Sequence, residues 1–245
     1  MHSKRDALFT DKTHTVGDFN FGEQTAEVFD DMLDRSIPMY RELQRMVGEI
    51  AGEFAAEGTN VYDLGCSTGI TLETLHLNVG AGTTLVGFDY SEAMLERARQ
   101  RFQPLIESGR MRLDHADLNR GCVIENASVV VLNLTLQFIR PLYRDSLVRQ
   151  IAAGLNDNGA LILVEKVLAT DSTINRLFIK FYYDMKRRNG YDEMEIAQKR
   201  EALENVLIPY RVDENVELLR RCGFREVETF YRWYNFCGFV ALKRA

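Results

Sequence analysis

Strand-like and helix-like patterns of hydrophobic and polar residues alternate through the middle of this chain. Five short segments read as strands, at residues 61–64, 84–89, 111–115, 127–132 and 160–165. The fourth is a nearly continuous apolar run, which is typical of a strand buried on both faces of a parallel sheet. Between the strands, apolar residues recur at helical spacing. The alternation predicts a doubly wound α/β fold with ligands bound at the carboxyl ends of its strands.

The segments on either side follow different patterns. Residues 24–56 have helical spacing that Pro38 interrupts, so we expect two helices there. Residues 171–209 break the alternation and predict a long helical insertion. The segments 226–234 and 236–242 predict an antiparallel hairpin that completes the sheet.

The length of 245 residues suits one large domain. We therefore expect a single domain over 1–245, with an N-terminal arm and helices at 1–56 and the helical insertion described above. Its fold class is α/β, Rossmann-like, with a seven-stranded, mostly parallel sheet and an antiparallel C-terminal hairpin.

Charge and cysteine content narrow the class of protein. The net charge of −6 argues against a tightly bound nucleic acid, because such partners require a basic surface. No apolar run approaches the 18 residues of a membrane span. The cysteines are scattered without a Cys-x-x-Cys pair, so we expect no metal, no disulfide framework and a cytoplasmic location. They are Cys66, Cys122, Cys222 and Cys237.

A glycine turn follows the first predicted strand, in the sequence Asp63-Leu64-Gly65-Cys66-Ser67-Thr68-Gly69. Glycine lets a ligand approach the main chain, and the helix expected from Ile70 would point its N-terminal amides at that ligand. The dinucleotide pattern G-x-G-x-x-G does not fit, and the Walker lysine is absent. The strand, its acidic residue and the Gly-x-Ser-x-Gly turn resemble motif I of the class I S-adenosylmethionine (SAM) methyltransferase-like superfamily. The resemblance implies a SAM-methyltransferase fold and SAM as the ligand.

Polar residues also end the next three strands. Asp89 ends the second strand, where a carboxylate accepts hydrogen bonds from ribose hydroxyls. Tyr90 follows it and either stacks on an adenine ring or belongs to the core. Asp117 follows the third strand, where this fold commonly contacts the adenine amino group, and Asn133 ends the fourth. Together with Asp63, these strand ends predict one nucleoside-binding site.

An aromatic segment, Phe19-Asn20-Phe21-Gly22, lies in the polar N-terminal arm. It has two interpretations, a lid over the binding site or an arm packed on the surface. Composition alone does not separate them.

Beyond motif I, the chain resembles the bacterial carboxy-S-adenosyl-L-methionine synthase (CmoA) family over nearly its whole length. The most specific likeness is the block Asn189-Gly190-Tyr191, Gln198-Lys199-Arg200 and Leu203-Glu204-Asn205-Val206. Further matching segments are Phe29–Met32, Arg35–Tyr40, Tyr62–Ser67, Asn133–Phe138 and Asn235-Phe236. Tyr90 stands where that family usually has Asn.

The family resemblance implies a reaction and a set of site residues. Such enzymes convert SAM and prephenate to carboxy-SAM and phenylpyruvate, and a separate enzyme uses carboxy-SAM to carboxymethylate a wobble uridine in tRNA. The ligand-contacting positions implied are Tyr40, Gly65, Cys66, Ser67, Asp89, Tyr90, Asp117, Leu118, Asn133 and Arg200. Of these, Tyr40 and Arg200 would act at the reacting group, Arg200 because a guanidinium can bind both oxygens of the new carboxylate. Without the resemblance, the sequence favours the interpretation of Arg200 as a surface arginine beside Lys199. The sequence does not identify the base that deprotonates the sulfonium methyl group.

Two other functions stay open. One is an ordinary SAM-dependent methyltransferase acting on a small molecule, which needs little beyond alignment of the nucleophile with the methyl group. The other is a non-catalytic SAM-binding module that acts through a partner. In each case the insertion at 171–209 is of a kind that often makes a dimer contact, so we expect a homodimer.

Overall fold

The computed structural model describes residues 4–10 and 17–244. Parts of the predicted N-terminal arm, at 1–3 and 11–16, therefore lie outside the described residues, as does residue 245.

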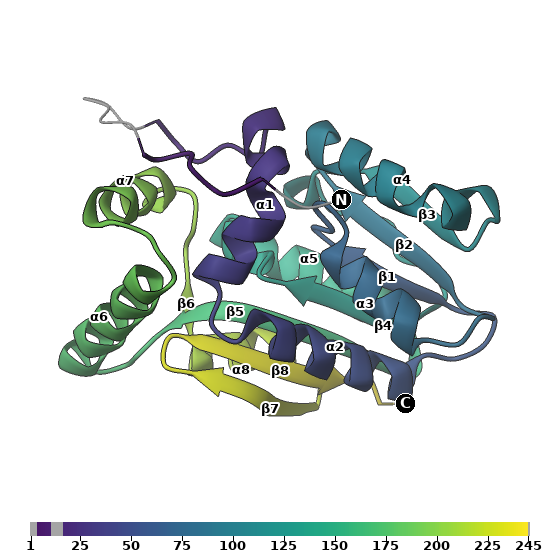
Figure 1. Cartoon of the computed structure of the whole chain (residues 1–245). Coiled ribbons are helices and arrows are strands. Elements are labelled where there is room, and N and C mark those ends of the chain that lie inside the picture. The colour runs from purple at the N-terminus through teal and green to yellow at the C-terminus, as the bar shows by residue number, and fades with distance from the viewer. Residues whose placement is uncertain (1–3, 11–16, 245) are drawn as a thin grey trace.

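A mixed β-sheet runs through the centre of the molecule (Figure 1). Its strands are β1 (Asn60–Leu64), β2 (Thr84–Asp89), β3 (Met111–His115), β4 (Ala127–Asn133), β5 (Leu155–Leu168), β6 (Tyr210–Arg211), β7 (Glu226–Trp233) and β8 (Phe236–Leu242). Seven of them lie in the order β3-β2-β1-β4-β5-β8-β7, and the two-residue β6 pairs separately with β5. Strands β1 to β5 are parallel, whereas β8 is antiparallel to both β5 and β7. The predicted fold class is confirmed, and β6 is an addition that the sequence pattern did not indicate.

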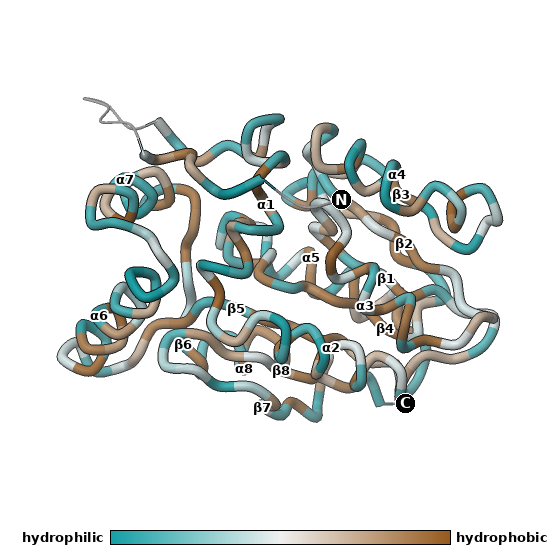
Figure 2. The backbone as a smooth tube through the Cα atoms, in the orientation of Figure 1, coloured by the Kyte–Doolittle hydropathy of each residue, from teal (hydrophilic) through white to brown (hydrophobic). Residues whose placement is uncertain are grey.

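Helices cover both faces of this sheet. They are α1 (Glu23–Ser36), α2 (Tyr40–Phe54), α3 (Ile70–Asn78), α4 (Glu92–Glu107), α5 (Pro141–Gly154), α6 (Ser172–Arg188), α7 (Glu193–Leu203) and α8 (Val212–Arg221). Helices α2, α3 and α4 contribute Leu43, Leu72 and Leu95 to the core on one face. Helices α5 and α8 contribute Leu147 and Leu218 to the core on the other. The central strands β1, β2 and β4 are buried along nearly their whole length and are largely hydrophobic (Figure 2), because helices cover them on both sides. The edge strand β7 is mostly exposed or half-buried.

The break between α1 and α2 occurs where Pro38 predicts it. Helix α1 ends at Ser36, and Met39 adopts a left-handed backbone conformation with φ of 51°. The chain then turns directly into α2, whose first residue is Tyr40. This tight corner places the Tyr40 side chain, which is buried, against the strand ends.

The helical insertion projects from one end of the sheet and lies beside α1 (Figure 1). The Asn189-Gly190-Tyr191 turn between α6 and α7 holds it there. Arg35 Nε donates to the carbonyl oxygen of Asn189 at 2.9 Å, and Asn189 Nδ2 donates to the carbonyl oxygen of Arg35 at 2.9 Å. The hydroxyl of Tyr191 donates to Asp6, so the described N-terminal arm is also fixed to the insertion.

The segment Asn156-Asp157-Asn158-Gly159 consists of residue types that commonly form turns, yet it belongs to a strand. Helix α5 ends at Gly154, and β5 begins at Leu155. Asn158 has φ of 63°, and the register between β4 and β5 shifts near Ala127. The strand thus absorbs these turn-forming residues as an irregularity at its start.

Candidate active site

A deep pocket opens at the carboxyl ends of β1, β2, β4 and β5, where a doubly wound sheet is expected to bind its ligand. The space within and above it is about 1360 Å³, part of which is open to solvent. All predicted contact residues except Arg200 line it. They are Tyr40, Gly65, Cys66, Ser67, Asp89, Tyr90, Asp117, Leu118 and Asn133.

The glycine turn at the end of β1 forms the floor of this pocket. The amides of Gly65 and Cys66 both donate to the carbonyl oxygen of Phe88, at 2.7 and 2.9 Å. Gly65 has φ of 80°, and a Cβ atom there would lie 2.5 Å from Oγ1 of Thr135. Both the backbone conformation and the close approach explain why this position is glycine.

Asp89 connects this turn to α4. One carboxylate oxygen accepts from the amide of Ser67 at 2.9 Å and the other from the amide of Ser91 at 2.8 Å. Ser91 in turn caps α4 by accepting from the amide of Met94. Burial raises the pKa of Asp89, while the hydrogen bonds from these amides oppose that shift. The carboxylate is therefore held in place with lone pairs to spare for a ribose.

Aromatic side chains surround the adjacent part of the pocket. Phe21 packs edge-on against Phe138 and Tyr90, with ring centroids 5.3 and 6.2 Å apart, and Phe19 packs against Phe21 at 4.9 Å. Because Phe19 and Phe21 line the pocket, the N-terminal aromatic segment covers it. Tyr90 is 55% exposed, which excludes the core interpretation and leaves its ring available for stacking.

In the described part of the chain, acceptor atoms without a partner belong to Asn133, which lines the pocket, and to Gln44, which does not line it but donates to the lining residues Tyr40 and Thr71. The side-chain amides of Gln44 and Asn133 both donate to Oγ1 of Thr71, at 3.2 and 3.1 Å, and Gln44 also donates to the Tyr40 hydroxyl at 2.9 Å. Among the described residues, Oε1 of Gln44 and Oδ1 of Asn133 find no hydrogen-bond partner although both are buried. Buried acceptors are normally satisfied. A bound ligand that brings hydrogen-bond donors, such as the α-ammonium group of an amino acid, fits this arrangement.

Asp63 lies near the end of β1 and does not line the pocket. It is buried, and its Oδ2 atom has no partner among the described residues. Burial and the neighbouring charge of Asp89 raise the pKa of Asp63 to about 8. Burial is the main cause of the raised pKa values of Tyr40 and Cys66, which line the pocket, and an ionised Asp63 would add to both shifts. A buried carboxyl group without a partner is disfavoured unless a cation binds nearby.

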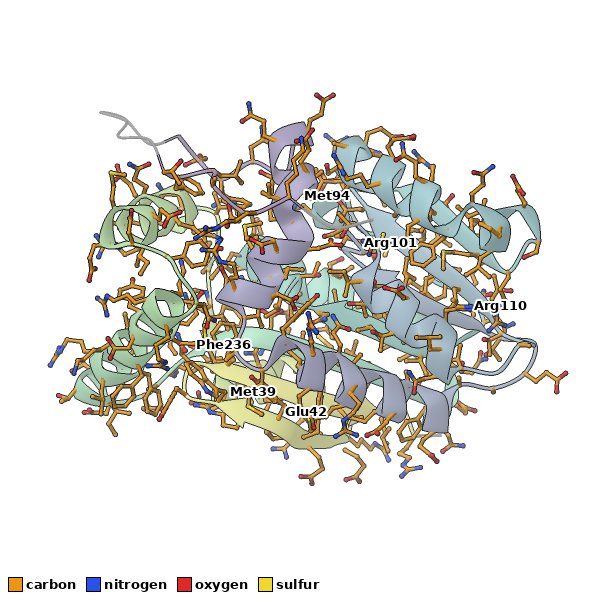
Figure 3. All side chains as sticks on the ribbon, viewed as in Figure 1. Met39, Glu42, Met94, Arg101, Arg110 and Phe236 are labelled. Atoms are coloured by element: carbon orange, nitrogen blue, oxygen red, sulfur yellow. The ribbon has the colours of Figure 1, made fainter. Side chains whose placement is uncertain are left out.

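The far end of the pocket contains residues that the sequence reasoning did not identify. Lys166, Tyr182, Lys199 and Phe236 line it. Phe236, labelled in Figure 3, lies at the end of the sheet nearest α6. Burial lowers the pKa of Lys166 to about 8. The sequence offered a signal for Lys166, which directly follows the predicted fifth strand, and the observed β5 extends past it to Leu168.

Arg200 is the one predicted contact residue outside the pocket. It is exposed on α7, whereas the preceding residue Lys199 is buried and lines the cavity. Successive residues of a helix point about 100° apart, so Lys199 can face inward while Arg200 faces outward. The role assigned to Arg200, as partner of a ligand carboxylate, stays a prediction.

Neither a metal site nor a membrane-spanning helix is found in the part of the chain that the structure describes. Within 4–10 and 17–244, no cluster of three or more His, Cys, Asp or Glu side chains has the arrangement of a metal site. In the same part of the chain, no helix is both long and apolar enough to cross a membrane.

Comparison with known proteins agrees with this geometry. A family model described as a methyltransferase domain matches residues 61–159. A carboxy-S-adenosyl-L-methionine synthase from Methylococcus capsulatus is 56% identical over 240 residues, which cover 98% of this chain and 99% of that protein. A second protein of that name, from Sulfurimonas denitrificans, is 44% identical over 92% of this chain and 94% of its own length.

Among solved structures, an O-methyltransferase family protein from Burkholderia thailandensis superposes with a TM-score of 0.65 at 17% identity. The match covers 91% of this chain and 60% of that one. At this identity the likeness concerns the fold, which is that of the SAM-dependent methyltransferases.

Proposed function

Because the chain belongs to the carboxy-S-adenosyl-L-methionine synthase family, we propose that it converts SAM and prephenate to carboxy-SAM and phenylpyruvate. The observation that carries the proposal is the 56% identity to a synthase across nearly the full length of both proteins. It includes the helical insertion and the strand ends that line the pocket, beyond the methyltransferase core itself.

The pocket geometry supports SAM as the first substrate. Asp89 would accept hydrogen bonds from the ribose, Asp117 and Leu118 would contact the adenine, and Tyr90 would stack on it. The unpartnered oxygens of Asn133 and Gln44 would accept from the α-ammonium group. Asp63, near the end of β1, would compensate the two positive charges of SAM.

The proposed reaction balances without an added oxidant or base. Prephenate would lose its ring carboxyl group as CO₂ and its ring hydroxyl as hydroxide, leaving phenylpyruvate. The hydroxide would take a proton from the sulfonium methyl group and leave as water. The resulting carbanion would attack CO₂ to form the carboxymethyl group of carboxy-SAM. The enzyme's task would be to hold both substrates together and to exclude bulk water.

Tyr40 is suited to a hydrogen-bonding role at the reacting end of SAM. Burial raises the pKa of its hydroxyl far above the neutral range, so the group stays protonated. Its oxygen accepts from Gln44, which leaves the hydroxyl proton for a ligand oxygen. We therefore assign Tyr40 as a donor to a carboxylate and not as the base. Arg200 remains the candidate for binding the new carboxylate. In that role its side chain would have to reach the pocket, whereas in this structure it is exposed on α7.

The wider role rests on the same family membership. We propose a cytoplasmic enzyme whose product supplies a separate tRNA carboxymethyltransferase, and which does not itself bind tRNA tightly. Ile174 and Leu177, at 46% and 43% exposure, are apolar side chains three residues apart on α6, so they lie on one side of that helix. A homodimer in which α6 packs against a second copy would cover both of them.

Incubation of the purified protein with SAM and prephenate tests the proposal, with mass spectrometry of the products. We expect a product heavier than SAM by the mass of CO₂, formed in step with phenylpyruvate. Methylation of an added small molecule with formation of S-adenosylhomocysteine would instead support the ordinary methyltransferase. Tight SAM binding without any turnover would support the non-catalytic module.

A further inference from the structure

Four cationic side chains meet at the insertion end of the pocket, around two tyrosine rings. Lys166 Nζ lies 4.8 Å from the centroid of the Tyr182 ring, and Lys186 Nζ lies 5.8 Å from it. Lys186 and Lys199 also lie 4.9 and 5.2 Å from the Tyr191 ring, with the Arg35 guanidinium at 4.0 Å.

Two of these four cations have carboxylate partners. Arg35 forms an ion pair with Asp31 at 3.3 Å, and Lys199 forms one with Asp6 at 3.4 Å and donates to Oγ of Ser36 at 3.2 Å. Within the described residues, neither Lys166 nor Lys186 has a carboxylate within ion-pair distance. Of these two, only Lys166 lines the cavity. A largely buried ammonium without a counter-ion is costly, and a ligand anion would remove that cost.

The position of Lys166 is fixed by its backbone. Its amide donates to Oε1 of Gln137 at 2.9 Å, and the residue pairs with Phe236 across the β5–β8 ladder. Two residues earlier on β5, Val164 pairs with Asn133, which lines the pocket. Lys166 therefore lies two residues farther along β5 than the position paired with Asn133, and its ammonium lies against the Tyr182 ring.

We propose that Lys166 is the carboxylate-binding residue for the second substrate, and that this substrate is an organic acid with a six-membered ring lying against Tyr182 and Phe236. The inference rests on the proposed function, since a synthase of this kind requires an acidic co-substrate. The inference adds two features to the proposed function: the lysine side chain that binds the carboxylate of that acid, and the aromatic side chains against which its ring lies. The two rings have centroids 5.4 Å apart and together form an apolar wall beside the charge.

The test measures binding of phenylpyruvate and of its methyl ester to the SAM-loaded protein by calorimetry. It compares wild type, Lys166→Met and Lys180→Met. Methionine has nearly the length of lysine without its charge, and Lys180 is an exposed lysine of α6 that does not line the pocket. We expect wild type and Lys180→Met to bind the acid at least about tenfold more tightly than the ester. Lys166→Met should lose roughly tenfold to a hundredfold in affinity for the acid and keep its affinity for SAM.

An acid-to-ester preference that survives in Lys166→Met would overturn the assignment. The melting temperature of the ligand-free protein is a second readout. It should rise in Lys166→Met, because this substitution removes an unpaired buried charge. If the lysine had a purely structural role, its loss would lower the melting temperature. Should the methionine variant not fold, Lys166→Gln repeats the comparison.

Turnover of SAM and prephenate separates failure of this inference from failure of the proposed function. Wild-type turnover combined with an unchanged preference in Lys166→Met overturns only the role of Lys166. Loss of the preference in Lys166→Met without any wild-type turnover supports the carboxylate site and overturns only the reaction.

Discussion

The buried carboxyl group of Asp63 gives a quantitative prediction that links pH, stability and ligand binding. Its pKa is about 8 in the folded protein, against an ordinary value of 3.8. At pH 7 the unfolded chain therefore carries an ionised Asp63 and the folded chain a protonated one. Each pKa unit corresponds to about 1.4 kcal/mol, so the free energy of unfolding is lowered by roughly 4 kcal/mol.

The sign of the pH effect follows from proton counting. Between pH 4 and pH 8 the folded state binds more protons at Asp63 than the unfolded state does, so its contribution destabilises the protein increasingly as pH rises. Asp63→Asn removes the titration while keeping the shape of the side chain. We expect the free energy of unfolding of the ligand-free variant at pH 7 to rise by roughly 2–4 kcal/mol, because the uncharged amide still has to be buried.

SAM binding should show the opposite trend. The sulfonium and α-ammonium charges favour ionised Asp63, so binding at pH 7 should release close to one proton. The affinity of wild type should increase by about tenfold from pH 6 to pH 7, in step with the ionised fraction of a group with a pKa near 8. In Asp63→Asn this dependence should be largely lost, apart from a smaller contribution from Asp89, whose pKa burial also raises.

Calorimetry in two buffers of different ionisation enthalpy measures the released proton directly, and chemical denaturation of the same two proteins measures stability. A variant that is less stable than wild type and binds SAM with unchanged proton release would refute the reasoning, because Asp63 would then be a neutral structural group.

Three other substitutions test separate parts of the site. Asp89→Ala should weaken SAM binding by roughly 1.5–3 kcal/mol. It should also lower the melting temperature, because the amides of Ser67 and Ser91 lose their acceptor. Unchanged SAM affinity by calorimetry would exclude the ribose contact. In urea denaturation, Gly65→Ala should lower the free energy of unfolding by about 2 kcal/mol more than Gly58→Ala does. Both glycines have positive φ, but only at Gly65 would a Cβ atom lie against another side chain. Equal losses in the two variants would contradict the packing argument. Arg200→Ala should keep SAM binding but lose about tenfold or more of any preference for carboxy-SAM, measured by competition; an unchanged ratio would make Arg200 a solvated surface residue.

Prediction from the sequence was most accurate at positions where the residue type alone restricts the local backbone or the burial. The Gly65 turn, the strand ending in Asp89 and the break at Pro38 depend on local backbone and burial rules, and all three occur where predicted. Because parallel strands end at one edge of the sheet, Asp89, Asp117 and Asn133 came together at the pocket as expected, whereas Asp63 does not line it.

Long-range placement was harder to predict. Lys199 and Arg200 are adjacent and both basic, and only the packing of α7 against the arm selects Lys199 as the inward residue. The Asp6–Tyr191 contact joins residues 185 positions apart, which no local pattern indicates. Lys166 was missed because a lysine ending a strand ordinarily faces solvent, whereas α6 covers this one with Tyr182.

Isotope tracing tests the central claim most directly. The protein is supplied with SAM whose transferable methyl group is fully deuterated and with prephenate labelled with ¹³C in its ring carboxyl group. If the chain is a carboxy-SAM synthase, mass spectrometry will find a single product that contains the adenosyl group, the ¹³C label and all but one of the methyl deuterons. A product that keeps every deuteron on a different molecule, with the ¹³C released only as CO₂, would contradict the account and identify an ordinary methyltransferase.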